Sequence, residues 1–214
     1  RPGSVVVGDL DGDGALDIAV ANTTISDVNI LLGNGDGTFQ SEQRFDAGDF
    51  PFSVAIGDLN GDGDPDLAVA NATGDDVSVL LGNGDGTFQS EQRFNVGDQP
   101  RSVAIGDLDA DGAPDLAVAN ATSDDVSVLL NQCPAAAPCD PATLFSQIDP
   151  TFDAGNGPWS IAKGDLDGDG APDLAVANVD SDDVSVLLGN GDGTFQSELR
   201  FGAGDEASSV AIED

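Results

Sequence analysis

Residues 53–71 read SVAIGDLNGDGDPDLAVAN, and this stretch decides the fold because close copies of it recur along the chain. The copies are SVVVGDLDGDGALDIAVAN at 4–22, SVAIGDLDADGAPDLAVAN at 102–120 and SIAKGDLDGDGAPDLAVAN at 160–178. Their first aspartates are Asp9, Asp58, Asp107 and Asp165, so the steps are 49, 49 and 58 residues, and another 49 reaches Asp214 in the closing SVAIED. The chain therefore contains four whole repeats and the opening segment of a further one.

Each repeat contains four short segments with the β-branched, alternating character of strands. In the second repeat these are 53–57, 66–71, 76–81 and 92–96, each bounded by Gly, Asn, Asp or Pro. A period near 50 with four strands predicts an all-β fold of β-propeller blades, each a sheet of four antiparallel strands. We expect blades at 4–52, 53–101, 102–159 and 160–208, the first strand of a further repeat at 209–214, and no helix.

The second strand of each repeat has no polar face. Leu67 and Val69 alternate with Ala68 and Ala70, so one side is bulky and the other small, as suits blades that pack against a neighbour on each side. The third repeat carries an insertion at 131–142 where the others have GNGDGTFQ. We expect Phe145 and Phe152 to take the places of Phe88 and Phe94, which makes the insertion a surface loop within one domain.

Acidic residues recur with the spacing D-x-[DN]-x-D-G-x-x-D between the first two strands of every repeat. Alternate carboxylates in such a loop face one concavity, and calcium takes six to eight oxygen ligands from side chains and backbone carbonyls. The predicted side-chain ligands are Asp9, Asp11, Asp13 and Asp17; Asp58, Asn60, Asp62 and Asp66; Asp107, Asp109, Asp111 and Asp115; and Asp165, Asp167, Asp169 and Asp173. The predicted backbone-carbonyl ligands are those of Ala15, Asp64, Ala113 and Ala171.

A glycine stands at the sixth position of each loop, where we expect a sharp turn that a side chain would obstruct. These glycines are Gly14, Gly63, Gly112 and Gly170. An EF-hand would have Glu at position 12 and continue into a helix, but that position is Val here and lies in a predicted strand. The pattern therefore favours a strand-loop-strand calcium site. Four metal-free Asp-Gly turns and magnesium are the alternatives, and we favour calcium because flexible oxygen ligands suit the larger ion.

A second glycine-rich segment, GNGDGTF, occurs at 33–39, 82–88 and 189–195. Asn-Gly and Asp-Gly are strong hairpin formers, so we interpret it as a turn. An auxiliary ion contact from Asp36, Asp85 or Asp192 is the alternative.

These motifs together resemble the FG-GAP, or VCBS, repeat family, which includes the propeller of the integrin alpha subunit. GDLDGDGxxDLAVAN followed by VSVLLGNGDGTF has the order that this family uses, and the match covers nearly the whole chain. The resemblance implies a β-propeller with calcium in the loop between the first two strands of a blade. It also implies roles in adhesion, cell-surface scaffolding and carbohydrate contact.

Charge and composition exclude several classes of partner and chemistry. With 40 acidic and 6 basic residues the net charge is −34, so nucleic acid and anionic membranes are not expected partners. No apolar stretch is long enough for a membrane-spanning helix. We expect no catalysis, because the chain has no His or Tyr, its only Lys is Lys163, and no Ser or Cys has an evident base. An aspartate pair acting as a glycosidase is the alternative.

Two cysteines, Cys133 and Cys139, flank the segment PAAAP of the insertion. Without His or further Cys a metal site is disfavoured, so we expect a disulfide and hence an extracellular or cell-surface location. The chain lacks Met and begins at Arg1, from which we expect a piece of a longer precursor. Because the opening strand of the repeat occurs once more at 209–214, we expect tandem repeats or self-association into a ring or fibre.

The residue after the Pro of the P-x-S motif varies between repeats while its neighbours hardly change. It is Gly3, Phe52, Arg101 or Trp159, on the face opposite the acidic loops. Phe52, Arg101 and Trp159 could form a recognition surface for a protein or carbohydrate ligand, or the aromatic rings could plug the propeller axis. On the same face Asn22, Asn71 and Asn120 begin N-x-T sequons, which either carry sugars or simply end a strand.

Overall fold

The computed structural model describes residues 1–133, 143–147 and 151–212, which form four antiparallel sheets joined in chain order. The first blade contains β1 (Pro2–Gly8), β2 (Asp17–Asn22), β3 (Asp27–Leu31) and β4 (Gln43–Asp46). The second contains β5 (Pro51–Gly57), β6 (Asp66–Asn71), β7 (Asp76–Leu80) and β8 (Gln92–Asn95). The third contains β9 (Pro100–Gly106), β10 (Asp115–Asn120), β11 (Asp125–Asn131), β12 (Phe145–Gln147) and β13 (Phe152–Asp153). The fourth contains β14 (Pro158–Gly164), β15 (Asp173–Asn178), β16 (Asp183–Leu187) and β17 (Leu199–Gly202).

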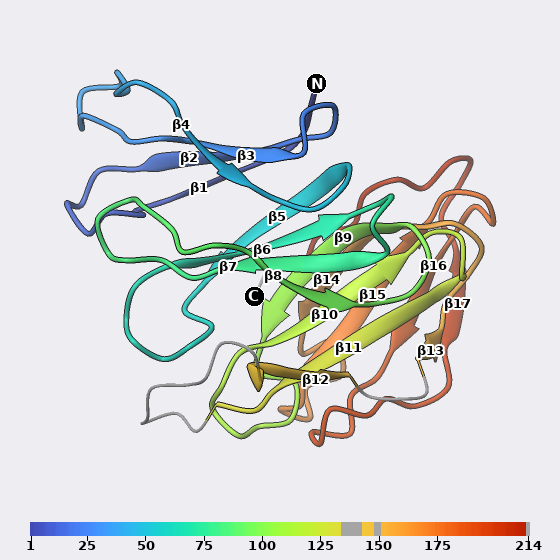
Figure 1. Cartoon of the computed structure of the whole chain (residues 1–214). Helices are drawn as coiled ribbons and strands as arrows, with labels where there is room; N and C mark the ends of the chain where they lie inside the picture. The colour runs from blue at the N-terminus through green and yellow to red at the C-terminus, as the bar shows by residue number, and fades with distance from the viewer. Residues whose placement is uncertain (134–142, 148–150, 213–214) are drawn as a thin grey trace.

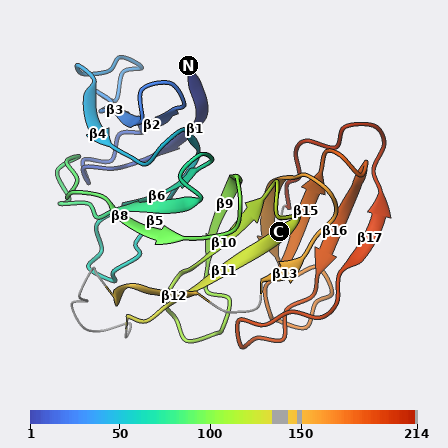
Figure 2. The ribbon, with the colours of Figure 1, turned by 45° about the vertical axis from the view of Figure 1, so that its right-hand side comes forward.

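The four sheets follow one another in an arc, with β1, β5, β9 and β14 as their innermost strands (Figures 1 and 2). Neighbouring innermost strands contact each other, and the Oγ atoms of Ser53 and Ser102 accept backbone N–H groups of Val103 and Ile161 in the next blade. The predicted β-propeller architecture is confirmed. The strand bounds predicted for the second repeat differ from those of β5 to β8 by two residues or fewer.

The hydrophobic core lies between blades, as the alternation of bulky and small residues predicts. Leu67 and Val69 on one face of β6 pack with Ala19, Ala21 and their neighbours of the first blade. Ala68 and Ala70 on the other face pack with residues of the third blade. Every residue of β6 is buried, because a central blade is covered on both sides.

The outward faces of the two terminal blades expose apolar side chains that central blades bury. Val5 is 63% exposed, whereas Val54, at the same place in the second repeat, is 6% exposed. In the fourth blade Leu199 and Phe201 are exposed. Beyond it, the backbone N–H of Val210 donates to Ser160 Oγ, so this segment lies beside β14 as β14 lies beside β9.

The third blade replaces the single outer strand with two short strands, β12 and β13, which both pair with β11. The predicted substitutions are confirmed. The ring of Phe145 contacts that of Phe94 at 5.4 Å, as Phe88 contacts Phe45 at 5.2 Å, and Phe152 pairs with Val126 as Phe94 pairs with Val77. The insertion therefore leaves the interblade contacts intact.

No helix among the described residues has the length and apolar character needed to span a membrane. Most of the predicted insertion, including Cys139, lies outside the described residues. Cys133 is buried and packs in the same core cluster as Leu144 and Phe145. The Cys133–Cys139 bond stays a prediction, which the mass of the unreduced chain would check.

Candidate metal centre

The acidic loops connect the innermost strand of each blade to the second strand, so they all lie on the same face of the arc. Within a loop, the carboxylates accept hydrogen bonds from the loop's own backbone. Asp9 accepts from Gly12 through Oδ1 at 2.8 Å and from Gly14 through Oδ2 at 3.0 Å, and Asp13 accepts from Ala15 at 2.7 Å. These bonds fold the loop around its first aspartate. Since a carboxylate has about four lone-pair sites, each oxygen can still coordinate an ion.

The last aspartate of each loop is fully buried and connects two loops. Its Oδ2 atom accepts from the residue after the first aspartate, for example Leu59 at 2.7 Å from Asp66. Its Oδ1 atom accepts a backbone N–H from the end of the third strand, and these bonds are Asp17–Gly33, Asp66–Gly82, Asp115–Asn131 and Asp173–Gly189. The sequence pattern identifies this aspartate as a ligand but does not reveal its second role as a clamp.

Three of the loops place three carboxylates close enough to hold one ion. In each set, one oxygen per residue lies within 4.8 Å of the others. The sets are Asp9, Asp11 and Asp13; Asp107, Asp109 and Asp115; and Asp165, Asp167 and Asp173. In the second loop Asn60 replaces an aspartate, and its Nδ2 atom donates to Asp62 at 2.8 Å. The structure thus clusters nine of the sixteen predicted side-chain ligands, three in each of three loops, while the other seven and the four carbonyl ligands stay a prediction.

Electrostatics within the loops favours a bound cation. Burial raises the pKa of Asp66 to about 7 and that of Asp115 to about 6. Burial, together with the charges of neighbouring aspartates, also raises the pKa values of Asp11 and Asp109. A divalent ion would stabilise the ionised form of these groups, because opposite charge offsets both desolvation and mutual repulsion.

The donor set fits a hard cation. The loops offer carboxylate, amide and carbonyl oxygens, and the chain has no His. Ca²⁺ or a similar ion would be held by the aspartates of each loop, including the buried last aspartate at the start of the second strand.

The glycine at position six is explained by backbone conformation. Gly14 and Gly63 have φ values of 88° and 92°, in the left-handed region that favours glycine. A Cβ added at either position would meet nothing within 4 Å, so the expected steric obstruction is wrong. Position four also has positive φ, which the sequence pattern does not reveal, and the third loop places Ala110 there at 62°.

The GNGDGTF segments form tight turns, as interpreted from the sequence. In the first, Asn34 donates its backbone N–H to the carbonyl of Thr38 at 2.9 Å, and Asp36 Oδ1 accepts the backbone N–H of Thr38 at 2.9 Å. The Thr38 hydroxyl also bonds to Asp36, and this bond and its equivalents hold the pKa values of Asp36, Asp85 and Asp192 below their usual range. The structure therefore gives these aspartates a local role within the turn.

Phe52, Arg101 and Trp159 are also brought together, at the opposite end of the innermost strands. The rings of Phe52 and Trp159 meet edge to face with centroids 5.4 Å apart. The guanidinium carbon of Arg101 lies 4.6 Å from the Phe52 centroid and 4.8 Å from the Trp159 centroid. All three side chains keep part of their surface exposed.

The sequon asparagines are structural. Asn71 and Asn120 are fully buried, and Asn22 is 8% exposed. Asn71 Nδ2 donates to Asp76 at 2.7 Å and to Ser78 at 2.9 Å. The same nitrogen would have to carry a glycan, so the folded blade argues against glycosylation and supports the alternative that these residues end a strand.

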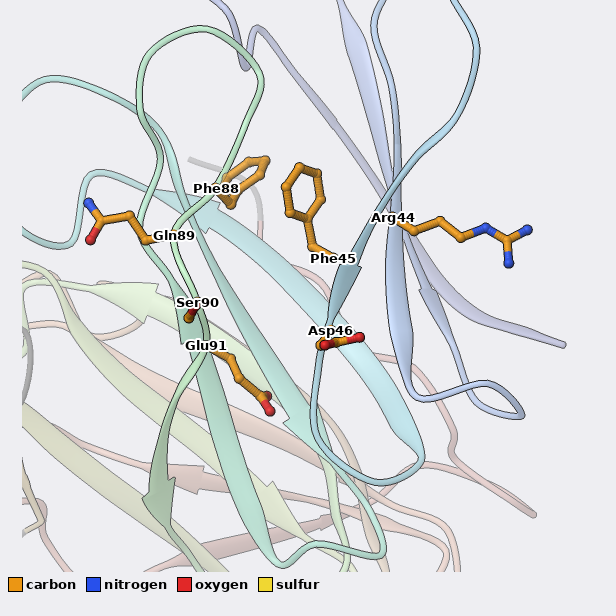
Figure 3. A pocket seen from close by; sticks show the side chains of 7 residues that line it. All are labelled: Arg44, Phe45, Asp46, Phe88, Gln89, Ser90 and Glu91. Atoms are coloured by element: carbon orange, nitrogen blue, oxygen red, sulfur yellow. The ribbon is translucent and has the colours of Figure 1, made fainter.

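A groove of about 310 Å³ lies between the first two blades at their outer rim (Figure 3). The rings of Phe45 and Phe88 meet edge to face in its wall, and Asp46 and Glu91 also line it. An equivalent groove between the third and fourth blades contains Phe152 and Phe195. Glu91 is already bonded to Ser78 and Arg93, so the groove is the polar margin of an interblade core.

A sequence model described as FG-GAP-like repeat matches residues 9–69, 58–118 and 165–214. The chain belongs to the FG-GAP-like repeat family. Each matched range begins at the first aspartate of a loop, and together the ranges include the acidic loops of all four blades. No curated protein sequence matches this FG-GAP-like chain.

Solved structures share the fold of this FG-GAP-like chain. The periplasmic gluconolactonase PpgL of Pseudomonas aeruginosa has a TM-score of 0.67 at 19% identity, over 97% of this chain and 55% of its own. An Agrocybe aegerita lectin that recognises non-reducing terminal N-acetylglucosamine has a TM-score of 0.59 at 25% identity, over 94% and 52%. BBS1N, in complex with ARL6DN, has a TM-score of 0.60 at 19% identity, over 94% and 56%. The chain thus spans just over half the length of these relatives.

Proposed function

We propose that this chain is a calcium-binding β-propeller module that serves adhesion or structural scaffolding outside the cell or at its surface. The observation that carries the proposal is the clustering of three carboxylates within 4.8 Å in three of the four loops. Four bound divalent ions would offset eight of the 34 net negative charges. Extracellular calcium modules bind in the 10⁻⁴–10⁻³ M range, and first aspartates that keep part of their surface exposed suit such a site.

Thermal unfolding with calcium and with a chelator tests this proposal. If ions bind only the folded chain, calcium at about a thousand times its dissociation constant raises the free energy of unfolding by roughly 4 kcal/mol per site. We expect a large rise in melting temperature with calcium and a smaller one with magnesium. A melting temperature that a chelator leaves unchanged would contradict the proposal.

Carbohydrate binding is the second candidate function. It is favoured by the likeness to the Agrocybe aegerita lectin and by the exposed aromatic and arginine cluster at the propeller axis. Aromatic rings and Arg are common anchors for ligands. A glycan array probed with the calcium-loaded chain would test this role.

We also propose that the chain has no catalytic activity. The gluconolactonase likeness, at 19% identity, concerns the fold alone. The conspicuous aspartates are engaged in loop bonding, and no His is present to act as a base. A screen against lactone, glycoside and ester substrates is the test, and turnover of any of them would contradict this part of the proposal.

Finally, we propose that further blades, in tandem or from another copy of the chain, pack on the terminal blades. The support is that Val5 is exposed where Val54 is buried, and that Phe201 is exposed where Phe94 is partly buried. Light scattering of the native material tests it, and a calcium-loaded monomer with both faces bare to solvent would count against it.

A further inference from the structure

The innermost strand of every blade begins with a β-bulge directly after its proline. The register shifts between Pro51 and Ser53, and equivalent shifts occur in the other three blades. The extra residue in each bulge is the variable one, namely Gly3, Phe52, Arg101 and Trp159. Because a bulge re-aims its side chain, three side chains converge where the strands begin, while Gly3 at the equivalent position contributes none.

Arg101 packs against both rings and uses few of its hydrogen-bond donors among the described residues. Its guanidinium carbon lies within 5 Å of both ring centroids, 4.6 Å from Phe52 and 4.8 Å from Trp159. Stacking uses the faces of the guanidinium, while its N–H groups lie in the plane. Among the described residues it makes one side-chain hydrogen bond, from Nη2 to Gln99 at 3.2 Å, and its Nε atom is buried without a partner.

Arg101 also differs from the chain's other strand arginines in having no carboxylate partner. Arg44, Arg93 and Arg200 each form an ion pair with a neighbouring acid. Within the described ranges no ion pair involves Arg101, although the chain has 40 acidic residues. A partly buried cation without an acidic partner in so acidic a chain points to an external anion as its partner.

A cavity of about 270 Å³ opens beside this arginine. Its walls include Arg1, Thr23, Phe50, Phe52, Arg101 and Trp159, and no acidic residue lines it. Drug-sized ligands occupy pockets of roughly 300–1,000 Å³, so this cavity suits one ring. Aromatic walls suit the apolar face of a sugar, and a planar guanidinium suits a carboxylate in bidentate geometry.

We propose that this cavity binds the carboxylate of a uronic-acid sugar through Arg101, with Phe50 and Trp159 against the ring. The inference deepens the ligand-binding role proposed above and is independent of calcium binding at the opposite end of the strands. A chain of net charge −34 repels anions in general, so saturable binding of an acidic sugar identifies a local site.

Trp159 is the only tryptophan of the chain, so its fluorescence reports on this cavity alone. The experiment titrates the calcium-loaded chain with methyl glucuronoside, and in parallel with methyl glucoside, at physiological ionic strength. We expect a saturable change with the glucuronoside and at least about tenfold weaker binding of the neutral sugar, because hydrogen bonds to charged groups contribute more than neutral ones.

Variants separate the ligand contact from a role in folding. Arg101→Gln and Arg101→Lys are both expected to weaken glucuronoside binding at least about tenfold, since lysine lacks the planar fork. Arg44→Gln, which removes an exposed and paired arginine, is the matched control and should leave binding unchanged. An unchanged stabilisation by calcium in the Arg101 variants shows that they are folded.

Three results would overturn the proposal. One is a Trp159 signal that does not respond to the glucuronoside while calcium still stabilises the chain. Another is equal binding of the two glycosides, which would show that the chain binds sugars but does not recognise the carboxylate. The third is a response to a peptide with a free carboxyl terminus and none to the glucuronoside.

Discussion

The Oδ1 atom of Asp66 accepts the backbone N–H of Gly82 at 2.8 Å and thereby connects the acidic loop of the second blade to the hairpin after β7. An added Cβ at Gly82 would lie 2.2 Å from the carbonyl oxygen of Pro65, so a side chain at this position requires a local shift of the backbone. In the third blade Asn131 occupies the position equivalent to Gly82. Its Nδ2 atom donates to the carbonyl of Pro114 at 2.9 Å and to that of Leu59, in the second blade, at 2.7 Å. Asn131 thus bridges the acidic loops of the second and third blades.

Asp66→Asn should remove most of the calcium-dependent stabilisation contributed by the second loop. The asparagine amide has a single oxygen to serve both the ion and the two backbone N–H groups, whereas the carboxylate has two oxygens. The loss should approach roughly 4 kcal/mol at calcium about a thousand times the dissociation constant. Unfolding with calcium and with a chelator measures the difference. Asp64→Asn is the control, because only the backbone carbonyl of Asp64 is predicted to bind; equal losses in both variants would refute the assignment.

The calcium-free chain should become more stable as the pH falls from about 8 to about 5. Burial raises the pKa of Asp66 to about 7 and that of Asp115 to about 6, above the ordinary value of 3.8. The folded chain then binds protons that the unfolded chain does not, so this stability is gained below these pKa values and lost as the pH rises through them. Denaturant unfolding in chelator measures it. Calcium should flatten the profile by keeping both carboxylates ionised, and a calcium-free profile unaffected by Asp66→Asn would be evidence against this cause.

Ala110→Gly should stabilise the chain by about 1 kcal/mol, because Ala110 has a φ of 62° where the other loops have glycine. Relief of left-handed strain exceeds the entropy that glycine adds to the unfolded chain. The reverse change, Gly61→Ala at a φ of 74°, should destabilise by a similar amount. Both are read from denaturant midpoints in calcium and in chelator. No gain from Ala110→Gly would show that the third loop carries no strain.

Repetition made much of the fold accessible from the sequence. The alternation of Leu67 and Val69 with Ala68 and Ala70 predicts a blade covered on both faces, and those residues do divide between two interblade cores. Local spacing likewise predicts the loop ligands, because residues two apart in a tight loop stay close. The bond from Asp66 to Gly82 spans 16 residues, and the stacking of Arg101 joins three blades, so neither follows from local spacing.

The bulge at the start of each innermost strand also lies outside what the pattern shows. Ser53 was the predicted first residue of its strand, whereas β5 begins at Pro51 and includes Phe52 as the extra residue. Periodicity predicts paired residues and has no signal for an unpaired one. The same limitation explains the sequons, because N-x-T describes a sequence and not the burial of Asn71.

Asn71→Asp should lower the stability of unglycosylated, bacterially produced protein, because Asn71 acts as a buried donor. Its Nδ2 atom bonds to Asp76 and to Ser78, and a carboxylate there would face Asp76 at close range inside the blade. Loss of the donor and burial of like charges should cost about 3 kcal/mol or more. Thr73→Val removes the same sequon at an exposed position and should leave the melting temperature nearly unchanged. The two variants together distinguish the roles, because a purely glycan-bearing asparagine would make both changes neutral in a bacterial host.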